Sequence, residues 1–157
     1  MPAKKILVVD DDPVILKALS FALEHSGYEV LTAVDGPEAF SIVRRNRPDL
    51  ILLDIFFPPD AFQSGNTWDA FLIVQWLQRM GEPQARHIPI IVVSGAKPEE
   101  FKSRSLAVGA LAYFQKPVEI SDLLDTIHQV FHPRVSETAF EGAAVSNSEH
   151  LRLARYY

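Results

Sequence analysis

Five short apolar runs, each followed by an amphipathic stretch, most constrain how this chain can fold. The runs are Ile6–Val9, Val30–Ala33, Leu50–Leu53, Pro89–Val93 and Leu111–Phe114. The third run is apolar throughout, which is typical of a strand buried on both faces. Strands that alternate with helical patterns of this length indicate βα units and a parallel sheet with helices on both sides. The predicted fold is therefore α/β, with a doubly wound five-stranded parallel sheet.

The stretches between the runs carry apolar residues at helical spacing. Residues Ile15–Leu23 show this spacing after the first run, and Gly27 closes that segment. A third helix is expected around Ile73–Met80, and a fourth helix, opened by Pro98, has a poor apolar stripe. Residues Ile120–Phe131 form a strong final helical face.

The composition changes after His132. Residues Ser136–Ser148 are mostly small and polar and are typical of a linker. Residues Ser148–Tyr157 are more apolar and have a composition compatible with a short helix. The whole tail is far below the size of a second domain. We therefore predict one domain over residues 1–132 and a C-terminal linker or tail over 133–157, with a short helix over 148–157 as an option.

Composition excludes several functional classes. The formal net charge is −5, so the chain lacks the basic footprint of a DNA- or RNA-binding module. There are no cysteines, which excludes disulfides, thiol catalysis and cysteine-ligated metal clusters. No apolar run is long enough for a signal peptide or a membrane span. The expectation is a soluble cytoplasmic protein that binds neither nucleic acid nor membrane.

Polar residues mark the carboxyl ends of the predicted strands. They are Asp10, Asp11 and Asp12 after the first strand, Asp54 after the third, Ser94 after the fourth, and Lys116-Pro117 after the fifth. In an open parallel α/β sheet, ligands bind just outside the carboxyl ends of the strands. We therefore expect these side chains to converge on one edge of the sheet and to form the functional site.

The three adjacent aspartates, Asp10–Asp12, need an explanation because like charges packed together repel. One explanation is local, since acidic residues favour the first turn of a helix and Pro13 suits the first helical position. The other is that a divalent cation shares the carboxylates. The convergence with Asp54 favours the cation, because oxygen ligands at this density suit Mg²⁺. Lys116 and Ser94 would then complete a pocket for a phosphoryl group.

The motifs VVDDDP, LLDI, VVSG and YFQKP, in this order and at strand ends, resemble the receiver (CheY-like) domain of two-component response regulators. The resemblance covers about residues 4–131 and implies a (βα)5 flavodoxin-like fold. It implies that Asp54 is the phosphoacceptor, Ser94 the switch hydroxyl and Lys116 the phosphate-facing lysine. It also implies that Tyr113 is the switch aromatic and that the bond from Lys116 to Pro117 is cis.

The resemblance further implies a bound Mg²⁺ ion as cofactor. Asp10 and Asp11 match the acidic pair of the family, and Asp12 falls at a variable third position. The ligands would be Asp11, Asp54 and the backbone carbonyl of Phe56, with Asp10 helping directly or through water. Phe56 and Ala96 stand two positions beyond Asp54 and Ser94, and neither side chain can hydrogen-bond a hydrolytic water, so a long-lived phosphorylated form is expected.

The function implied is that of a single-domain response regulator and not of an enzyme. Asp54 would accept a phosphoryl group from a sensor histidine kinase or a histidine phosphotransfer protein. Phosphorylation would then switch a protein-interaction surface formed by the fourth helix, the fifth strand and the final helix. That surface would bind a downstream protein target or a second copy of the chain.

Two alternatives remain. The pattern Asp10-x-Asp12-x-Val14 also resembles the signature of haloacid-dehalogenase-type phosphatases, which additionally need an acidic motif after a later strand. Only Asp122 and Asp125 follow Lys116 as aspartates, and both lie in a helical pattern. A pseudo-receiver, which acts purely as an interaction module, is the other alternative, although it usually lacks the acceptor or the lysine.

The chain departs from the family pattern in two places. The interval from Asp54 to Ser94 is longer than usual, and the extra residues are expected within 57–67, beside the predicted phosphorylation site. The second departure is the tail. Its last residues, Ser148–Tyr157, are expected to form a contact element that touches the switching face or a second protomer.

Overall fold

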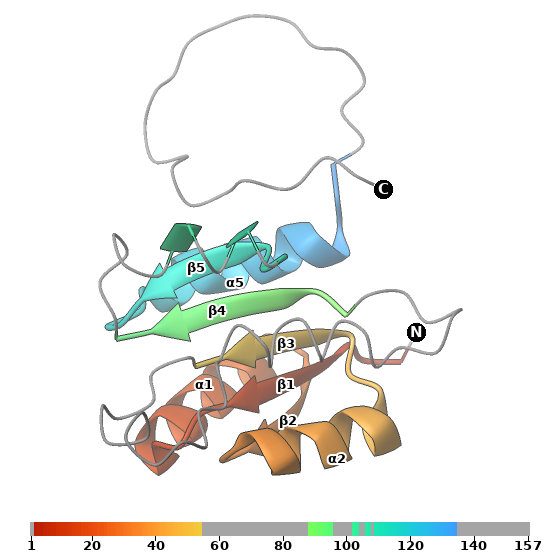
Figure 1. Ribbon diagram of the computed structural model, residues 1–157. Helices are drawn as coiled ribbons and strands as arrows, with labels where there is room; N and C mark the ends of the chain where they lie inside the picture. Colours follow the sequence, from red (N-terminus) through yellow and green to blue (C-terminus); the bar gives the residue numbers. More distant parts are fainter. Residues whose placement is uncertain (1, 55–87, 96–101, 104–105, 108, 135–157) are drawn as a thin grey trace, which may run out of the picture.

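A computed structural model of the chain describes residues 2–54, 88–95, 102–103, 106–107 and 109–134. These residues form a five-stranded sheet (Figure 1) whose strands are β1 (Lys5–Val9), β2 (Glu29–Ala33), β3 (Leu50–Leu53), β4 (Ile90–Ser94) and β5 (Ala112–Gln115). The strand order is β2-β1-β3-β4-β5, and every pairing is parallel. This is the flavodoxin-like order of a doubly wound sheet, so the predicted fold class is confirmed.

Strand bounds agree with the sequence patterns to within one residue. β5 begins at Ala112 rather than Leu111, and β4 begins at Ile90 and includes Ser94, which had been placed just after the strand. The ladder between these strands continues past their apolar residues, because Lys116 N donates to the carbonyl of Ser94 over 2.9 Å. Backbone pairing therefore fixes the position of Lys116 relative to Ser94.

The described helices are α1 (Pro13–His25), α2 (Gly36–Asn46) and α5 (Ile120–Phe131). Residues 102–103 and 106–107 are also helical, within the stretch where the fourth helix was expected. The predicted third helix around Ile73–Met80, the start of the fourth helix at Pro98, the loop 57–67 and the tail beyond residue 134 lie outside the described residues.

Side chains of each strand alternate between two cores, one on each face of the sheet. Leu7, Ile51 and Val92 point to the face covered by α2, where Phe40 and Val43 pack against them. The other face is covered by α1 and α5, and its buried residues include Val8, Leu52, Val93, Leu19 and Ile127. Helices cover both faces of the sheet (Figure 1), so the central strands β3 and β4 are buried throughout and have nearly continuous apolar sequences.

The two helices on the second face begin and end in ways that fit their sequence. Asp12 is extended at the N-cap of α1 and accepts a hydrogen bond from Val14 N over 2.8 Å, with Pro13 in the first turn. Gly27 follows the end of α1 with a φ of 88°, a left-handed conformation that glycine adopts without strain. Tyr28 then packs against Phe131 at the end of α5, with ring centroids 5.7 Å apart. The C-terminal ends of α1 and α5 are therefore neighbours.

Among the residues that the structure describes, there is no helix of the length and apolar character that crossing a membrane would require.

Candidate functional site

Asp10 and Asp54 are brought together by the pairing of β1 with β3. Val9 and Leu53 face each other in the ladder, so the residues that follow them occupy neighbouring positions at the carboxyl edge of the sheet. Asp54 N donates to the carbonyl of Val9 over 2.9 Å, and Asp10 N donates to the carbonyl of Ala33 over 3.0 Å. The two carboxylates are therefore fixed through the backbone, as the strand-end pattern predicted.

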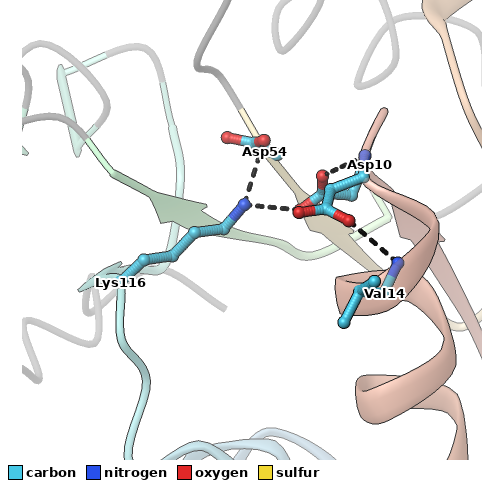
Figure 2. Close-up of polar contacts among 5 residues, drawn as sticks. Asp10, Val14, Asp54 and Lys116 are labelled. Carbon is cyan, nitrogen blue, oxygen red and sulfur yellow. Dashed lines mark hydrogen bonds and ion pairs between the residues drawn. The ribbon is translucent and has the colours of Figure 1, made fainter.

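Lys116 comes from the far edge strand of the same sheet. It directly follows β5, and its bond to Pro117 is cis, as predicted. Because β4 and β3 lie between β5 and β1 in the sheet, the lysine side chain has to extend past β4 to reach the aspartates. Figure 2 shows it doing so, with its ammonium group between Asp10 and Asp54.

The ammonium of Lys116 donates to both carboxylates. Its Nζ lies 2.5 Å from Oδ2 of Asp10 and 3.1 Å from Oδ2 of Asp54 (Figure 2). The Asp10 and Asp54 side chains are only 3% and 7% exposed, so the pairs lie in a poorly solvated place where electrostatic attraction is strong. Burial alone would lower the pKa of Lys116, but the hydrogen bonds to Asp10 and Asp54 outweigh it and raise the pKa above its usual value.

Three carboxylates at this edge have the arrangement of a cation site. Asp10, Asp11 and Asp54 can each offer an oxygen such that all three oxygens lie within 4.8 Å of one another. The side chains of Asp10 and Asp54 are buried and Asp11 is exposed, so the group opens to solvent on the side of Asp11. Mg²⁺ takes a few carboxylate oxygens and keeps several waters, and this partly open group of hard oxygen ligands fits it.

The three adjacent aspartates do not share one role. Asp12 caps α1 through its side chain, and the backbone N–H of Asp12 donates to Oδ1 of Asp10 over 2.9 Å. The local explanation therefore holds for Asp12, while Asp10 and Asp11 belong to the carboxylate group. The reason lies in the backbone: Asp12 is extended at the helix start, so its carboxylate turns toward the first free N–H groups.

Ser94 and Tyr113 lie on one face of the sheet, on neighbouring strands. Ser94 on β4 pairs with Gln115 on β5. Tyr113 precedes Gln115 by two residues on β5, so the side chains of Tyr113 and Ser94 lie on the same face of the sheet. Both side chains are almost fully buried, at 0% and 2% exposed, and Tyr113 belongs to the core on the same face of the sheet as α2. The structure thus brings the predicted switch hydroxyl close to the predicted switch aromatic.

Other predicted features fall outside the site or outside the described residues. Phe56, Ala96 and the loop 57–67 are not among the described residues. Asp122 and Asp125 lie exposed on α5, so neither provides the strand-end acidic motif that a haloacid-dehalogenase-type phosphatase needs.

The direct pairing of Lys116 with Asp10 was not predicted from the sequence, which indicated only a phosphoryl-binding role for the lysine. The signal was present, because an ammonium and several carboxylates were predicted at one sheet edge and opposite charges in a partly buried site pair with each other. The strength of the attraction between Lys116 and Asp10 depends on how deeply the two side chains are buried, which the sequence does not reveal.

Comparison with known proteins agrees with this geometry. A family model described as "Response regulator receiver domain" matches residues 6–128. The polar-differentiation response regulator DivK of Brucella anthropi is 31% identical over 124 residues, which cover 79% of this chain and 93% of DivK. The alkaline phosphatase synthesis transcriptional regulatory protein PhoP of Bacillus subtilis is 35% identical over 147 residues, 93% of this chain. The chain spans only 55% of the length of PhoP.

Solved structures show the same fold. The chemotaxis protein CheY4 of Vibrio cholerae superimposes with a TM-score of 0.69 at 31% identity, covering 82% of this chain and 99% of CheY4. A CheY-like receiver domain protein from Methanospirillum hungatei also gives a TM-score of 0.69, at 30% identity, and covers 83% of this chain and 95% of that protein.

Proposed function

The chain belongs to the family of response regulator receiver domains, and from this premise we propose that Asp54 accepts a phosphoryl group. The observation that carries the proposal is the position of Lys116, whose ammonium lies 3.1 Å from the Asp54 carboxylate and also contacts Asp10. A lysine in this position neutralises the charge of phosphoryl oxygens as they approach Asp54.

The chemistry needs few parts. A carboxylate oxygen of Asp54 attacks the phosphorus of a phosphohistidine, the new P–O bond forms, and the P–N bond to the leaving imidazole breaks. Lys116 moves from pairing with carboxylates to pairing with the transferred phosphoryl group. Ser94 and Tyr113, buried on neighbouring strands, are proposed to convert the new charge into a change of surface.

Mg²⁺ is the proposed cofactor. Asp10, Asp11 and Asp54 would hold it, together with the backbone carbonyl of Phe56 that the family resemblance implies. When bound, the ion supplies positive charge that offsets the phosphoryl oxygens. The side chains of this protein do the positioning: Asp54 presents its oxygen, and Asp10 holds the Lys116 ammonium beside it.

Response regulator receivers interact with histidine kinases and with downstream targets. For this chain, we propose a sensor histidine kinase or a histidine phosphotransfer protein as the donor. We propose that output occurs through protein contact on the face of the fourth helix, β5 and α5, with a target or a second copy.

The similarity over 93% of DivK supports a response regulator of one domain, covering residues 1–132 and followed by the tail 133–157. No catalysis beyond the domain's own phosphorylation and dephosphorylation is proposed. The cytoplasmic location stays a prediction.

Intact-mass spectrometry after incubation with Mg²⁺ and acetyl phosphate tests the proposal. The chain should gain one phosphate, Asp54→Ala should gain none, and Asp125→Asn, which removes an exposed carboxylate on α5, should behave like the original. If the original chain gains no phosphate, the pseudo-receiver alternative replaces this proposal. A phosphate that remains in Asp54→Ala would place the acceptor elsewhere.

A further inference from the structure

The outward face of α1 is unusually apolar. Val14 is 71% exposed and Phe21 is 63% exposed, and both rank among the few large apolar side chains that the described residues leave to solvent. Ala18 and His25 are exposed on the same helix, and the rings of Phe21 and His25 lie 3.9 Å apart. We call Val14, Ala18, Phe21 and His25 the α1 stripe. The other side of α1 is already buried against the sheet through Leu16, Leu19 and Leu23.

The spacing of the α1 stripe indicates what kind of segment covers it. Its residues follow one another at intervals of four, three and four positions, which is the spacing of a seam between two packed helices. Such a seam accepts a second helix whose apolar residues recur in the same way. The occupant should therefore be an amphipathic helical segment.

The chain itself contains a segment of this kind in its last ten residues. His150, Leu153, Ala154 and Tyr157 recur at i, i+3, i+4 and i+7, so they would share one face if residues 148–157 were helical. The charges flanking this face also match those of α1. If the segment ran parallel to α1, Glu149 would lie toward Lys17 and Arg155 toward Glu24, so opposite charges would meet.

The point where the described chain ends makes this contact accessible. Arg134 follows closely after Phe131, whose ring contacts Tyr28 just beyond the end of α1. Residues 135–147 can extend to about 45 Å, whereas the 13 residues of α1 span about 20 Å. The connecting segment is therefore long enough to run back along α1 and to present residues 148–157 in either direction.

We propose that residues 148–157 dock as a helix on the α1 stripe of the same chain. The sequence alone predicts a contact with the switching face or a second protomer, and that stays a prediction; the present proposal names the α1 stripe instead. It rests on the exposed side chains of α1 and not on phosphorylation, so it stands or falls separately from the proposed function. A docked segment would cover apolar surface that begins at Val14, one turn from the aspartate group.

Disulfide trapping can test the contact cleanly, because the chain has no cysteines of its own. The double variant Ala18→Cys/Ala154→Cys, oxidised mildly at low protein concentration, should form an intramolecular disulfide. The matched control is Arg45→Cys/Ala154→Cys, which places the first cysteine on α2, on the opposite face of the sheet. Docking predicts cross-linking at least about tenfold faster in the first variant, because the docked segment has a high effective concentration at α1.

A third variant removes the proposed contact without touching the core. Adding Phe21→Ser to Ala18→Cys/Ala154→Cys should slow cross-linking severalfold, since Phe21 is the largest residue of the α1 stripe. Equal rates in the α1 and α2 variants would overturn the proposal. A disulfide formed only between chains would also overturn it and would assign the α1 stripe to a second copy.

Discussion

Lys116 donates to Asp10 over 2.5 Å, a shorter contact than its 3.1 Å bond to Asp54, the proposed acceptor. The lysine is thus anchored by a carboxylate that takes no part in the proposed covalent step. The same ammonium pairs with two of the three carboxylates of the proposed cation site. Lys116 and Mg²⁺ should therefore compete for the same negative charge.

The first prediction follows from this competition. Lys116→Ala should bind Mg²⁺ more tightly than the original chain, by roughly threefold to tenfold, because a positive charge is removed beside the ligands. The same variant should lose the phosphorylation-induced changes in its NMR spectrum, since the phosphoryl group loses its counter-ion. Isothermal titration measures the affinity. Weaker Mg²⁺ binding in Lys116→Ala would show that the lysine does not compete for the site.

Two neighbouring aspartates should give opposite phenotypes. Asp11→Ala should weaken Mg²⁺ binding by about tenfold or more while leaving stability nearly unchanged, because Asp11 is exposed and belongs to the carboxylate group. Asp12→Ala should lower the free energy of unfolding by about 1 kcal/mol through loss of the α1 cap. Its effect on Mg²⁺ affinity should be much smaller. Titration and urea unfolding of both variants check this pair, and similar Mg²⁺ affinities in the two would refute the division of roles.

A buried hydroxyl in α1 offers a stabilising substitution. Oγ of Ser20 is shielded from solvent and has no hydrogen-bond partner among the described residues. Ser20→Ala removes an unsatisfied polar atom and improves helix propensity, so it should raise the free energy of unfolding by about 1 kcal/mol. Ser26→Ala on the same chain is the matched control, because the Ser26 hydroxyl donates to the Ala22 carbonyl. Destabilisation by Ser20→Ala in urea unfolding would mean that the hydroxyl has a partner in solution.

Tyr28 should make stability depend on pH in the alkaline range. Burial raises its pKa above 10.0, so the folded state holds the phenolic proton more tightly than the unfolded state. This contribution is fully present below pH 10 and is lost as the pH rises through the folded pKa. Tyr28→Phe cannot ionise, so the original chain should lose stability relative to this variant between about pH 9 and pH 11. Urea unfolding at several pH values gives the free energy of unfolding of both proteins. A constant difference between the two proteins over this pH range would contradict the prediction.

The lifetime of the phosphorylated form provides a fifth test. Phe56 and Ala96 offer no polar side chain to orient a hydrolytic water, so dephosphorylation should be slow. Phe56→Asn should accelerate the loss of phosphate, as followed by intact mass over time. Phe56→Leu is the control that keeps the position apolar. Equal rates for Phe56→Asn and Phe56→Leu would assign the control of lifetime to other residues.

The sheet was predictable because its evidence is local and repeated. Runs such as Leu50–Leu53 signal buried strands by themselves, and the polar residues after them locate the functional edge. Strand ends were less certain, since Leu111 is as apolar as a strand residue yet precedes β5. An apolar pattern does not record where ladder hydrogen bonds begin.

The detailed roles at the site were harder to predict, because they depend on distances between strands. Asp10, Asp11 and Asp12 are chemically identical in sequence, and only the backbone conformation of Asp12 assigns it to helix capping. The pairing of Lys116 with Asp10 needs the strand order, which brings β5 within reach of β1 past β4 and β3. The outward exposure of Phe21 is likewise visible only in the structure, because the helical spacing over Ile15–Leu23 does not show which apolar residues stay in solvent.

The orientation of α5 has a practical consequence for attaching reporters to this protein. The aspartates and Lys116 lie at the carboxyl edge of the sheet, whereas α5 runs back and ends at the opposite edge (Figure 1). A fluorophore or reporter domain fused after Arg134 would start at least about one strand length, roughly 15 Å, from Asp54, the proposed acceptor. Such a reporter would leave the carboxylate site accessible. It would respond to the proposed phosphorylation through a conformational change of the domain and not through direct contact with the site.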